Sequence, residues 1–137
     1  MDMFQTSRPE GEDREKHRAP ALPLMFSKEN PTKPGQSVRQ FLVLVDTGTS
    51  SSLLPYKVSK KLKLNLDTSQ DLYVHTASNQ RVRVTGVAHC FVKDHQASFW
   101  HLIRFLVIKE ATVILIGNRD LKSLRLLDKN FPDFLGN

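Results

Sequence analysis

The stretch FLVLVDTGTSSSLLP, residues 41–55, combines an apolar run that ends at an acid with a string of small hydroxyl residues. The apolar run predicts a buried strand, and Asp46 follows it directly. A buried carboxylate is costly unless hydrogen bonds, a partner charge or a raised pKa compensate it. No basic residue adjoins this acid, but Thr47 and Thr49 offer hydroxyls, and Gly48 allows a tight turn whose backbone N–H groups approach the carboxylate. The segment therefore predicts an acid held in a fixed orientation, although Asp-Thr-Gly alone is also an ordinary turn sequence.

The composition limits the class of protein. A chain of 137 residues with 39% hydrophobic and 25% charged side chains predicts one small domain with a tail. No segment approaches the roughly 18 consecutive apolar residues of a membrane-spanning helix, and the N-terminal residues lack the pattern of a secretory signal. Cys90 is the only cysteine, which excludes an intrachain disulfide and a cysteine-based zinc site. We therefore expect a protein of a reducing compartment that neither spans a membrane nor is secreted.

The net charge of +6 is unevenly distributed. Acidic and basic residues balance within residues 1–37, so the excess of positive charge lies in residues 38–137. Four lysines gather within residues 57–63, where we interpret them as a solvated basic surface. Attraction to nucleic acid is the alternative. We do not expect nucleic acid as a partner, because aromatic residues are not interleaved with these charges.

The pattern along the chain predicts an all-β domain with one late helix. Residues 1–20 carry mixed charge and few apolar side chains, which predicts a disordered leader before a domain at 21–137. Two strands that flank a turn containing proline and glycine predict a β-hairpin. The expected strands are 22–28, 37–45, 71–77, 81–92, 97–108 as one strand or a pair, and 111–117. Residues 58–64 predict a short helix or an irregular turn, and 118–129 predict a helix with Asn118 as its cap.

Two further motifs make the first one specific. Residues 114–121, ILIGNRDL, lead from an apolar strand through a glycine into the predicted helix, and 75–86, HTASNQRVRVTG, form the predicted polar-tipped hairpin. With the Asp-Thr-Gly stretch, these motifs resemble the retroviral and retrotransposon aspartic proteases, the retropepsin-like family, in the order expected. The resemblance covers roughly residues 21–130 and implies a single-lobe closed β-barrel with one short C-terminal helix.

The same resemblance implies a homodimer. The chain has one Asp-Thr-Gly signature, so the second catalytic acid would be Asp46 of a second copy, on a two-fold axis. Two adjacent carboxylates share one proton, and a water activated between them attacks a peptide bond. By resemblance, Thr47 braces the two loops across the axis, Gly48 lets the backbone approach the substrate, and Thr49 takes the position of the hydroxyl residue in pepsin-like enzymes. Neither a metal nor another cofactor is implied.

The resemblance also implies a flap that closes over the substrate. Its substrate-binding residues would be His75, Thr76, Ala77, Ser78, Asn79 and Gln80, and its tip, 77–80, lacks the glycines of many retroviral flaps. Val43, Val84 and Ile114 could line pockets, although ordinary core positions are the simpler interpretation. The terminal segment 131–137 is the candidate for the interleaved dimer strand, but Pro132 cannot donate to a central ladder.

We expect an aspartic endopeptidase that processes a retroviral or retrotransposon polyprotein in the cytoplasm or within virus-like particles. The alternative is a catalytically inactive, domesticated domain of the same fold that dimerises or binds peptides. The intact Asp-Thr-Gly favours the enzyme. Other chemistry has weaker support: the gaps between His89, His95 and His101 match no common metal motif, and no nucleophile elbow surrounds serines 50–52, which we interpret as turn hydroxyls.

Overall fold

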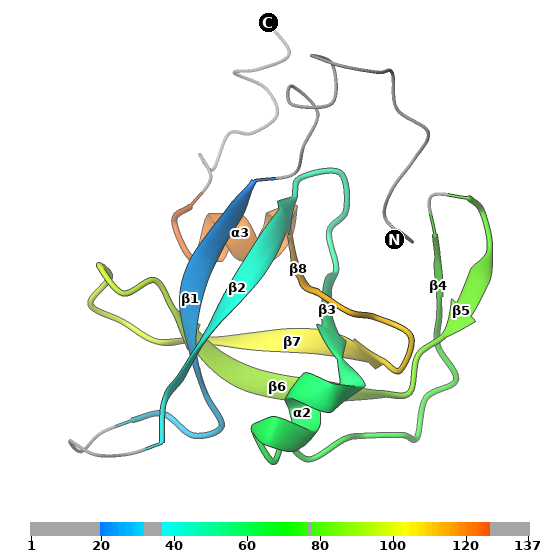
Figure 1. Ribbon diagram of the computed structural model, residues 1–137, viewed down its shortest axis with the longest axis horizontal. Coiled ribbons are helices and arrows are strands. Elements are labelled where there is room, and N and C mark those ends of the chain that lie inside the picture. Colours follow the sequence, from blue (N-terminus) through cyan, green and yellow to red (C-terminus); the bar gives the residue numbers. More distant parts are fainter. Residues whose placement is uncertain (1–19, 32–36, 77, 127–137) are drawn as a thin grey trace, which may run out of the picture.

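The computed structural model describes residues 20–31, 37–76 and 78–126, and in these ranges the chain forms a closed β-barrel with a separate hairpin and two short helices (Figure 1). The elements are β1 (Ala21–Ser27), β2 (Arg39–Asp46), β3 (Ser52–Pro55), α2 (Tyr56–Lys61), β4 (Tyr73–His75), β5 (Arg81–Arg83), β6 (Gly86–Lys93), β7 (His101–Ile108), β8 (Ile114–Gly117) and α3 (Asn118–Ser123).

Six strands close the barrel in the order β1-β2-β8-β3-β7-β6, with β6 returning to β1. The predicted hairpin of the first two strands is confirmed, since β1 and β2 pair in antiparallel register. The late strand β8 inserts beside β2, to which it is parallel, and pairs on its other side with β3. The predicted all-β barrel with a short helix near its C-terminal end is therefore confirmed.

Alternation along the strands builds the core. In β2, Val43 is 1% exposed whereas its neighbour Leu42 is 67% exposed, so one face of the strand points into the barrel. All four residues of β8 are buried, as expected of a strand with neighbours on both sides. The ring of Phe26 lies 6.1 Å from that of Phe105 at the centre of the core. Val43 and, likewise, Val84 and Ile114 are buried, so the interpretation of these residues as core is confirmed.

Strand β3 is the element that the sequence did not reveal. It contains only four residues and begins at Ser52, which is 1% exposed. The interpretation of all three serines 50–52 as turn hydroxyls was therefore wrong for Ser52. Pro55 ends the strand and, with φ −62°, lies directly before α2. This helix begins two residues before the predicted segment 58–64 and ends three residues before its end.

Several predicted boundaries also differ from the structure. The strand expected over 81–92 is divided between β5 and β6, because the backbone N–H groups of Val84 and Thr85 donate to Leu72 and Val107 at the crossing. The strand expected from residue 97 begins at His101, and Phe99 is 74% exposed. Within the described residues the late helix ends at Ser123. The leader, apart from residue 20, and the terminal segment 131–137 lie outside the described residues.

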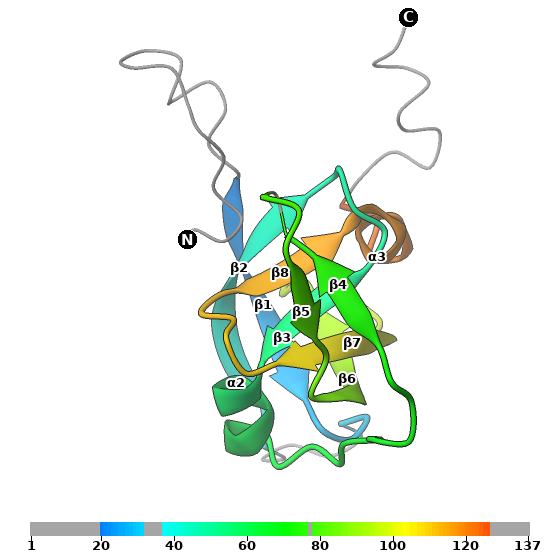
Figure 2. The same ribbon diagram turned by 90° about the vertical axis from the view of Figure 1, so that its right-hand side faces the viewer.

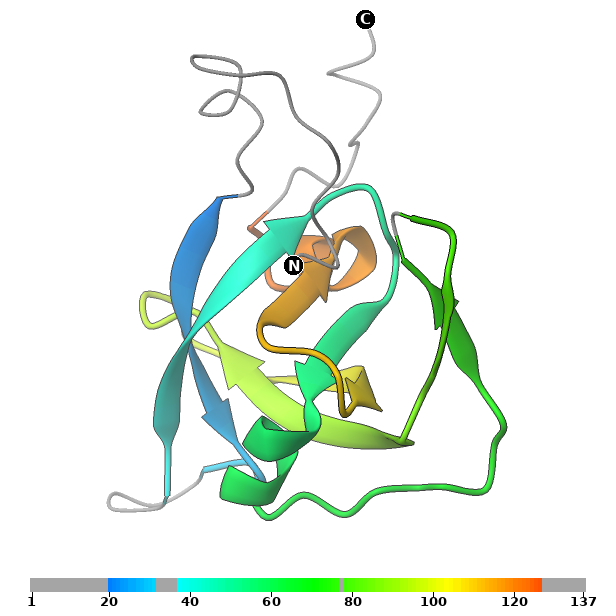
Figure 3. The ribbon, with the colours of Figure 1, turned by 45° about the vertical axis from the view of Figure 1, so that its right-hand side comes forward.

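The two ends of the barrel carry different elements. Figures 1, 2 and 3 show the loop after β2, the tip of the β4–β5 hairpin and α3 at one end, and α2 at the opposite end. Figure 3 shows the hairpin standing beside the barrel wall, with its tip directed toward the loop after β2. Neither helix of the described ranges is long and apolar enough to cross a membrane.

Candidate active site

Asp46 is the last residue of β2 and lies opposite Gly117 in the parallel register with β8. Its side chain is half-buried, and the backbone N–H of Gly48 donates to its Oδ1 at 2.9 Å. This bond closes a short turn in which the carboxylate bonds the backbone two residues later, as aspartates at strand ends commonly do. The acid therefore has a fixed orientation, as the sequence predicted.

The start of α3 holds the loop that follows Asp46. The backbone N–H of Asn118 donates to the carbonyl of Thr49 at 2.7 Å, and its side-chain Nδ2 donates to the carbonyl of Thr47 at 3.0 Å. Asn118 is thus the first helical residue and binds the loop, whereas the prediction made it the helix cap; the residue at the cap position is Gly117. The Asp-Thr-Gly and Ile-Gly-Asn motifs, 71 residues apart, form one site.

Gly117 is required here by close approach. A Cβ at this position would lie 2.6 Å from the carbonyl oxygen of Ser51 and 2.8 Å from that of Thr49, closer than real Cβ atoms come to backbone. The φ of −83° is accessible to any residue, so the restriction comes from space and not from backbone conformation. The strand and the loop can only pack this closely because the side chain is absent.

A polar pair, of which Ser52 is buried and Asp120 half-buried, supports the loop from the other side. The hydroxyl of Ser52 donates to the carboxylate of Asp120, and it accepts the backbone N–H of Gly117 at 3.0 Å. Partial burial raises the pKa of the Asp120 carboxyl, against the hydrogen bond from Ser52 and the charge of Arg119, which both lower the pKa. Neither Ser52 nor Asp120 was predicted from the sequence as part of the site.

A cleft of about 450 Å³ opens between the loop and the hairpin. From the predicted residues it gathers Asp46, Thr49, His75 and Thr76. Ser51, Leu53, Tyr73, Val74, Leu106 and Leu115 complete its lining. The last four lie in predicted strands, whereas nothing in the sequence indicated Ser51 or Leu53 as lining residues.

The remaining predicted site residues lie outside this lining. Thr47 and Gly48 are exposed on the loop, and Ser78, Asn79 and Gln80 are exposed at the hairpin tip. Ala77 lies outside the described residues. The hydroxyl of Thr49 accepts the backbone N–H of Ser51 at 3.3 Å, so in this single chain its bond is to its own loop.

The hairpin tip is closed by an asparagine in place of a glycine. Asn79 adopts φ 66°, the left-handed conformation that asparagine tolerates better than other residues with a side chain. The backbone N–H of Thr76 donates to the carbonyl of Gln80 at 2.9 Å, and that of Asn79 donates to Thr76 at 2.9 Å. The tip without glycine that the sequence predicted therefore forms a hydrogen-bonded turn.

The base of the hairpin is attached to the barrel. Val74, Val82 and Leu72 pack against a second apolar cluster of the barrel wall that contains Leu53 and Leu115. The guanidinium of Arg81 lies 4.1 Å from the ring centre of Tyr73 on the opposite strand. The hairpin is consequently anchored beside the carboxylate while its tip is exposed.

The site combines a carboxylate with hydroxyl groups and backbone N–H donors. A cluster of metal ligands is not found among the residues that the structure describes. Among the described residues, no three His, Cys, Asp or Glu side chains come together as a metal site requires. What the single chain offers chemically is one oriented carboxylate beside a cleft. A carboxylate of this kind can accept a proton from a bound ligand, and once protonated it can donate a proton to the ligand.

Comparison with solved structures identifies the fold. The structure described as "EIAV protease complexed with the inhibitor HBY-793" superposes on this chain with a TM-score of 0.57. The match covers 80% of this chain and 90% of that chain at 19% sequence identity, so it establishes a fold similar to that of a retroviral protease. No family model matches the sequence, and no curated protein matches it.

Proposed function

We propose that this protein is an aspartic endopeptidase that works as a homodimer. The observation that carries the proposal is the carboxylate of Asp46, oriented by the N–H of Gly48 at the edge of the 450 Å³ cleft. The similarity of the fold to that of a retroviral protease supports the proposal, and in this chain Asp46 lies at the end of β2, in the same cleft as the hairpin residues His75 and Thr76. Because one fold can serve many functions, the geometry of the site and not the fold carries the proposal.

The dimer is proposed from chemistry. Peptide hydrolysis of this type needs two carboxylates that share a proton, and the chain carries one Asp-Thr-Gly signature. Thr47 and Gly48 are exposed on the loop of the single chain, where a second copy can meet them about a two-fold axis. One Asp46 then removes a proton from a water, while the protonated Asp46 of the second copy donates to the peptide carbonyl.

The substrate we propose is an extended peptide segment of a polyprotein. An extended chain can pair with the open edges of the β4–β5 hairpin, which forms a two-stranded sheet of its own. The side chains of Tyr73 and His75 are exposed on β4 and belong to the cleft lining, so they would face such a chain. Movement of the hairpin tip would then enclose the peptide and exclude water.

The decisive experiment compares three purified chains on a mixed peptide library across pH about 4 to 7. The native chain should cleave peptides, Asp46→Asn should abolish cleavage, and Asp94→Asn, which removes a carboxylate outside the cleft, should leave it intact. Activity per chain should also rise with protein concentration, because a dilute dimer dissociates.

The same experiment addresses the alternative of an inactive domain that dimerises or binds peptides. Absence of cleavage at concentrations where sedimentation shows a dimer would overturn the peptidase proposal. Retained peptide binding by that dimer, unaffected by Asp46→Asn, would identify the inactive domain instead.

A further inference from the structure

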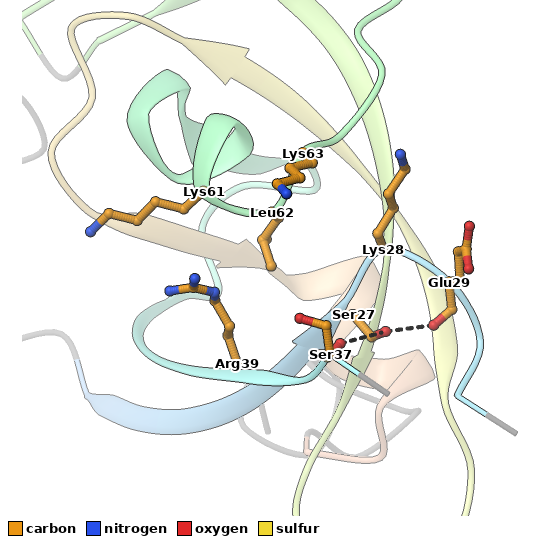
Figure 4. Close-up of a pocket in the computed structure, with 8 residues that line it drawn as sticks. All are labelled: Ser27, Lys28, Glu29, Ser37, Arg39, Lys61, Leu62 and Lys63. Carbon is orange, nitrogen blue, oxygen red and sulfur yellow. Dashed lines mark hydrogen bonds between the residues drawn. The ribbon is translucent and has the colours of Figure 1, made fainter. Parts of the chain in front are cut away.

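A second cleft, of about 310 Å³, lies at the end of the barrel opposite Asp46 (Figure 4). Its charged lining consists of Lys28, Arg39, Lys61 and Lys63, with Glu29 as the single acid. Because β2 starts at Arg39 and ends at Asp46, the two clefts are separated by the length of an eight-residue strand, on the order of 20 Å. The basic cleft is therefore distinct from the candidate active site.

The cations of this cleft are not neutralised by acids of the described chain. The ion pairs within the described ranges are Arg83 with Asp71 and His95 with Asp94, and neither involves the cleft. All four basic side chains are exposed. Figure 4 shows the carboxylate of Glu29 on the side of Lys28, away from Arg39 and Lys61. Four basic residues and one acid line the same concave surface, so its net charge is positive and its potential attracts anions.

Folding brings these charges together from three segments. Lys28 follows the end of β1, Arg39 begins β2, and Lys61 and Lys63 lie at the C-terminal end of α2. The buried hydroxyl of Ser27 donates to the carbonyl of Glu29 at 2.5 Å, and the carbonyl of Ser37, near the start of β2, lies 3.3 Å from the same oxygen. The ends of the two strands therefore lie side by side at the rim of the cleft.

The backbone at Lys63 gives a second, independent observation. Lys63 adopts φ 57°, the left-handed conformation that usually belongs to glycine after a helix. Its N–H donates to Lys60 and the N–H of Leu64 donates to Ser59, both at 3.0 Å, which completes the helix-ending motif. A lysine at this position costs stability that glycine would not, and the turn brings this lysine into the lining of the cleft.

We propose that this basic cleft binds the phosphodiester backbone of a nucleic acid strand without reading its sequence. Lys57 and Lys60, exposed on α2, extend the positive surface beyond the cleft, as a chain of successive phosphates requires. The concave shape suits a strand lying within it, whereas a bilayer presents a flat surface. The lysines of residues 57–63 were interpreted as a solvated surface because aromatic residues are not interleaved with them. Contacts to phosphates alone need no aromatic stacking, and the fold adds Lys28 and Arg39 to these lysines.

The structure supplies a matched pair of variants for the test. Arg125 follows α3 with φ 60°, and its N–H and that of Leu126 donate to Lys122 and Leu121 in the same helix-ending motif. Lys63→Gly and Arg125→Gly therefore each remove one positive charge and one strained backbone, but only Lys63 lines the cleft. Both variants should raise the melting temperature, which shows that each remains folded.

The test measures, by fluorescence anisotropy at several salt concentrations, how tightly the full chain binds a labelled single-stranded oligonucleotide of about 20 nucleotides. Lys63→Gly should weaken binding about three- to tenfold and reduce the slope of log affinity against log salt by about one. The double variant Arg39→Gln, Lys61→Gln should weaken it further, while Arg125→Gly should change it less than about twofold. Asp46→Asn should bind as the native chain does, whatever the outcome of the peptidase assay.

Three results would overturn the proposal. The first is no measurable binding of the oligonucleotide, and the second is equal weakening by Lys63→Gly and Arg125→Gly, which would indicate net charge alone. The third is cleft-dependent binding to vesicles containing phosphatidylserine, relative to phosphatidylcholine vesicles, without oligonucleotide binding. That result would assign the cleft to a membrane surface.

Discussion

The hydroxyl of Ser52 donates a hydrogen bond to the carboxylate of Asp120, 68 residues later in the chain. The same oxygen accepts the backbone N–H of Gly117 at 3.0 Å. Through this pair, β3, which follows the loop after Asp46, is joined to β8 and to α3, whose first residue also binds that loop. Both ends of the loop that follows Asp46 are therefore held, in part by side chains outside the cleft lining.

Replacing Ser52 by alanine should destabilise the fold by about 1–3 kcal/mol, because the buried N–H of Gly117 and the Asp120 carboxylate both lose their partner. Urea unfolding monitored by tryptophan fluorescence measures the change. Ser50→Ala, an exposed serine of the same loop, should stay within about 0.5 kcal/mol of the native chain. Equal stability of the two variants would show that the buried pair contributes nothing.

Stability should respond to pH through Asp120. Burial raises the pKa of this carboxyl above its ordinary 3.8, so the folded chain keeps the proton to higher pH than the unfolded chain. The contribution of the protonated Asp120 to the free energy of unfolding is complete below the pKa that this carboxyl has in the unfolded chain. It is lost as the pH rises through the pKa that the carboxyl has in the folded chain. The free energy of unfolding of Asp120→Asn, relative to the native chain, should therefore increase as pH rises from below 3.8 toward neutrality.

Asp67 provides a control, because its pKa is shifted in the opposite direction to that of Asp120. Hydrogen bonds from the side chain and backbone of Ser69 lower the pKa of the Asp67 carboxyl, so its contribution is present above 3.8 and is lost as pH falls through the folded pKa. Asp67→Asn should become relatively less stable than the native chain as pH rises. Urea titrations give the free energy of unfolding of each variant relative to the native chain at each pH. The same pH dependence for both variants would contradict the opposite pKa shifts of Asp67 and Asp120.

The two glycines of the site should behave differently. Gly117→Ala brings a Cβ to 2.6 Å from backbone, so we expect a loss of about 1–3 kcal/mol or more in the free energy of unfolding. At Gly48 a Cβ would lie 3.3 Å from the side-chain Oδ1 of Asp46, which can rotate away. Gly48→Ala should therefore remain folded but lose peptidase activity, and thermal melting with a cleavage assay on each variant separates the two effects.

Asn79 should control the opening of the hairpin tip. Asn79→Ala forces a left-handed backbone on a residue that cannot ease it with a local hydrogen bond, at a cost of about 1 kcal/mol, whereas Asn79→Gly removes the strain. Hydrogen exchange of the Thr76 amide, which is bonded to Gln80, should become about fivefold faster in the alanine variant. Unchanged exchange in the alanine variant would show that the turn does not depend on residue 79.

Cys90 should report on unfolding. It is buried, its thiol donates to the carbonyl of Ser27 at 3.2 Å, and burial raises the pKa of the thiol to about 12. Because the thiolate is the reactive form, iodoacetamide should not modify the native chain at neutral pH but should modify it fully in urea. Mass spectrometry measures the modification, and equal rates with and without urea would contradict the burial.

Local patterns predicted much of the fold. The β1–β2 hairpin was predicted because a turn containing proline and glycine separates two apolar runs, and α3 was predicted because leucines recur at helical spacing. Asp46 stood out because an acid ended an apolar strand. Each of these signals lies within one short segment, which is why a single sequence was sufficient to find it.

Contacts between distant segments could not be predicted in the same way. In the sequence Ser52 cannot be told apart from its neighbouring serines, because only the pairing of β3 with β7 and β8 distinguishes it. Asn118 is a residue type that commonly caps helices, and only its contact with the loop carrying Thr47 shows its other role. Lys28 and Lys61 adjoin one cleft only because the barrel closes. Short strands add to the difficulty, since four residues carry too little periodicity to predict β3.

Closure of the barrel also decides where another polypeptide can attach. Each of its six strands pairs with a neighbour on both sides over part of its length, although the start of β1 and the first half of β7 pair on one side alone. Self-association into fibrils by adding strands is thereby discouraged over most of the molecular surface. Within the described residues the β4–β5 hairpin is a separate two-stranded sheet, so both of its strands have an open edge. The edge of this hairpin shares its cleft with Asp46, so a foreign chain that docked there would lie next to the carboxylate.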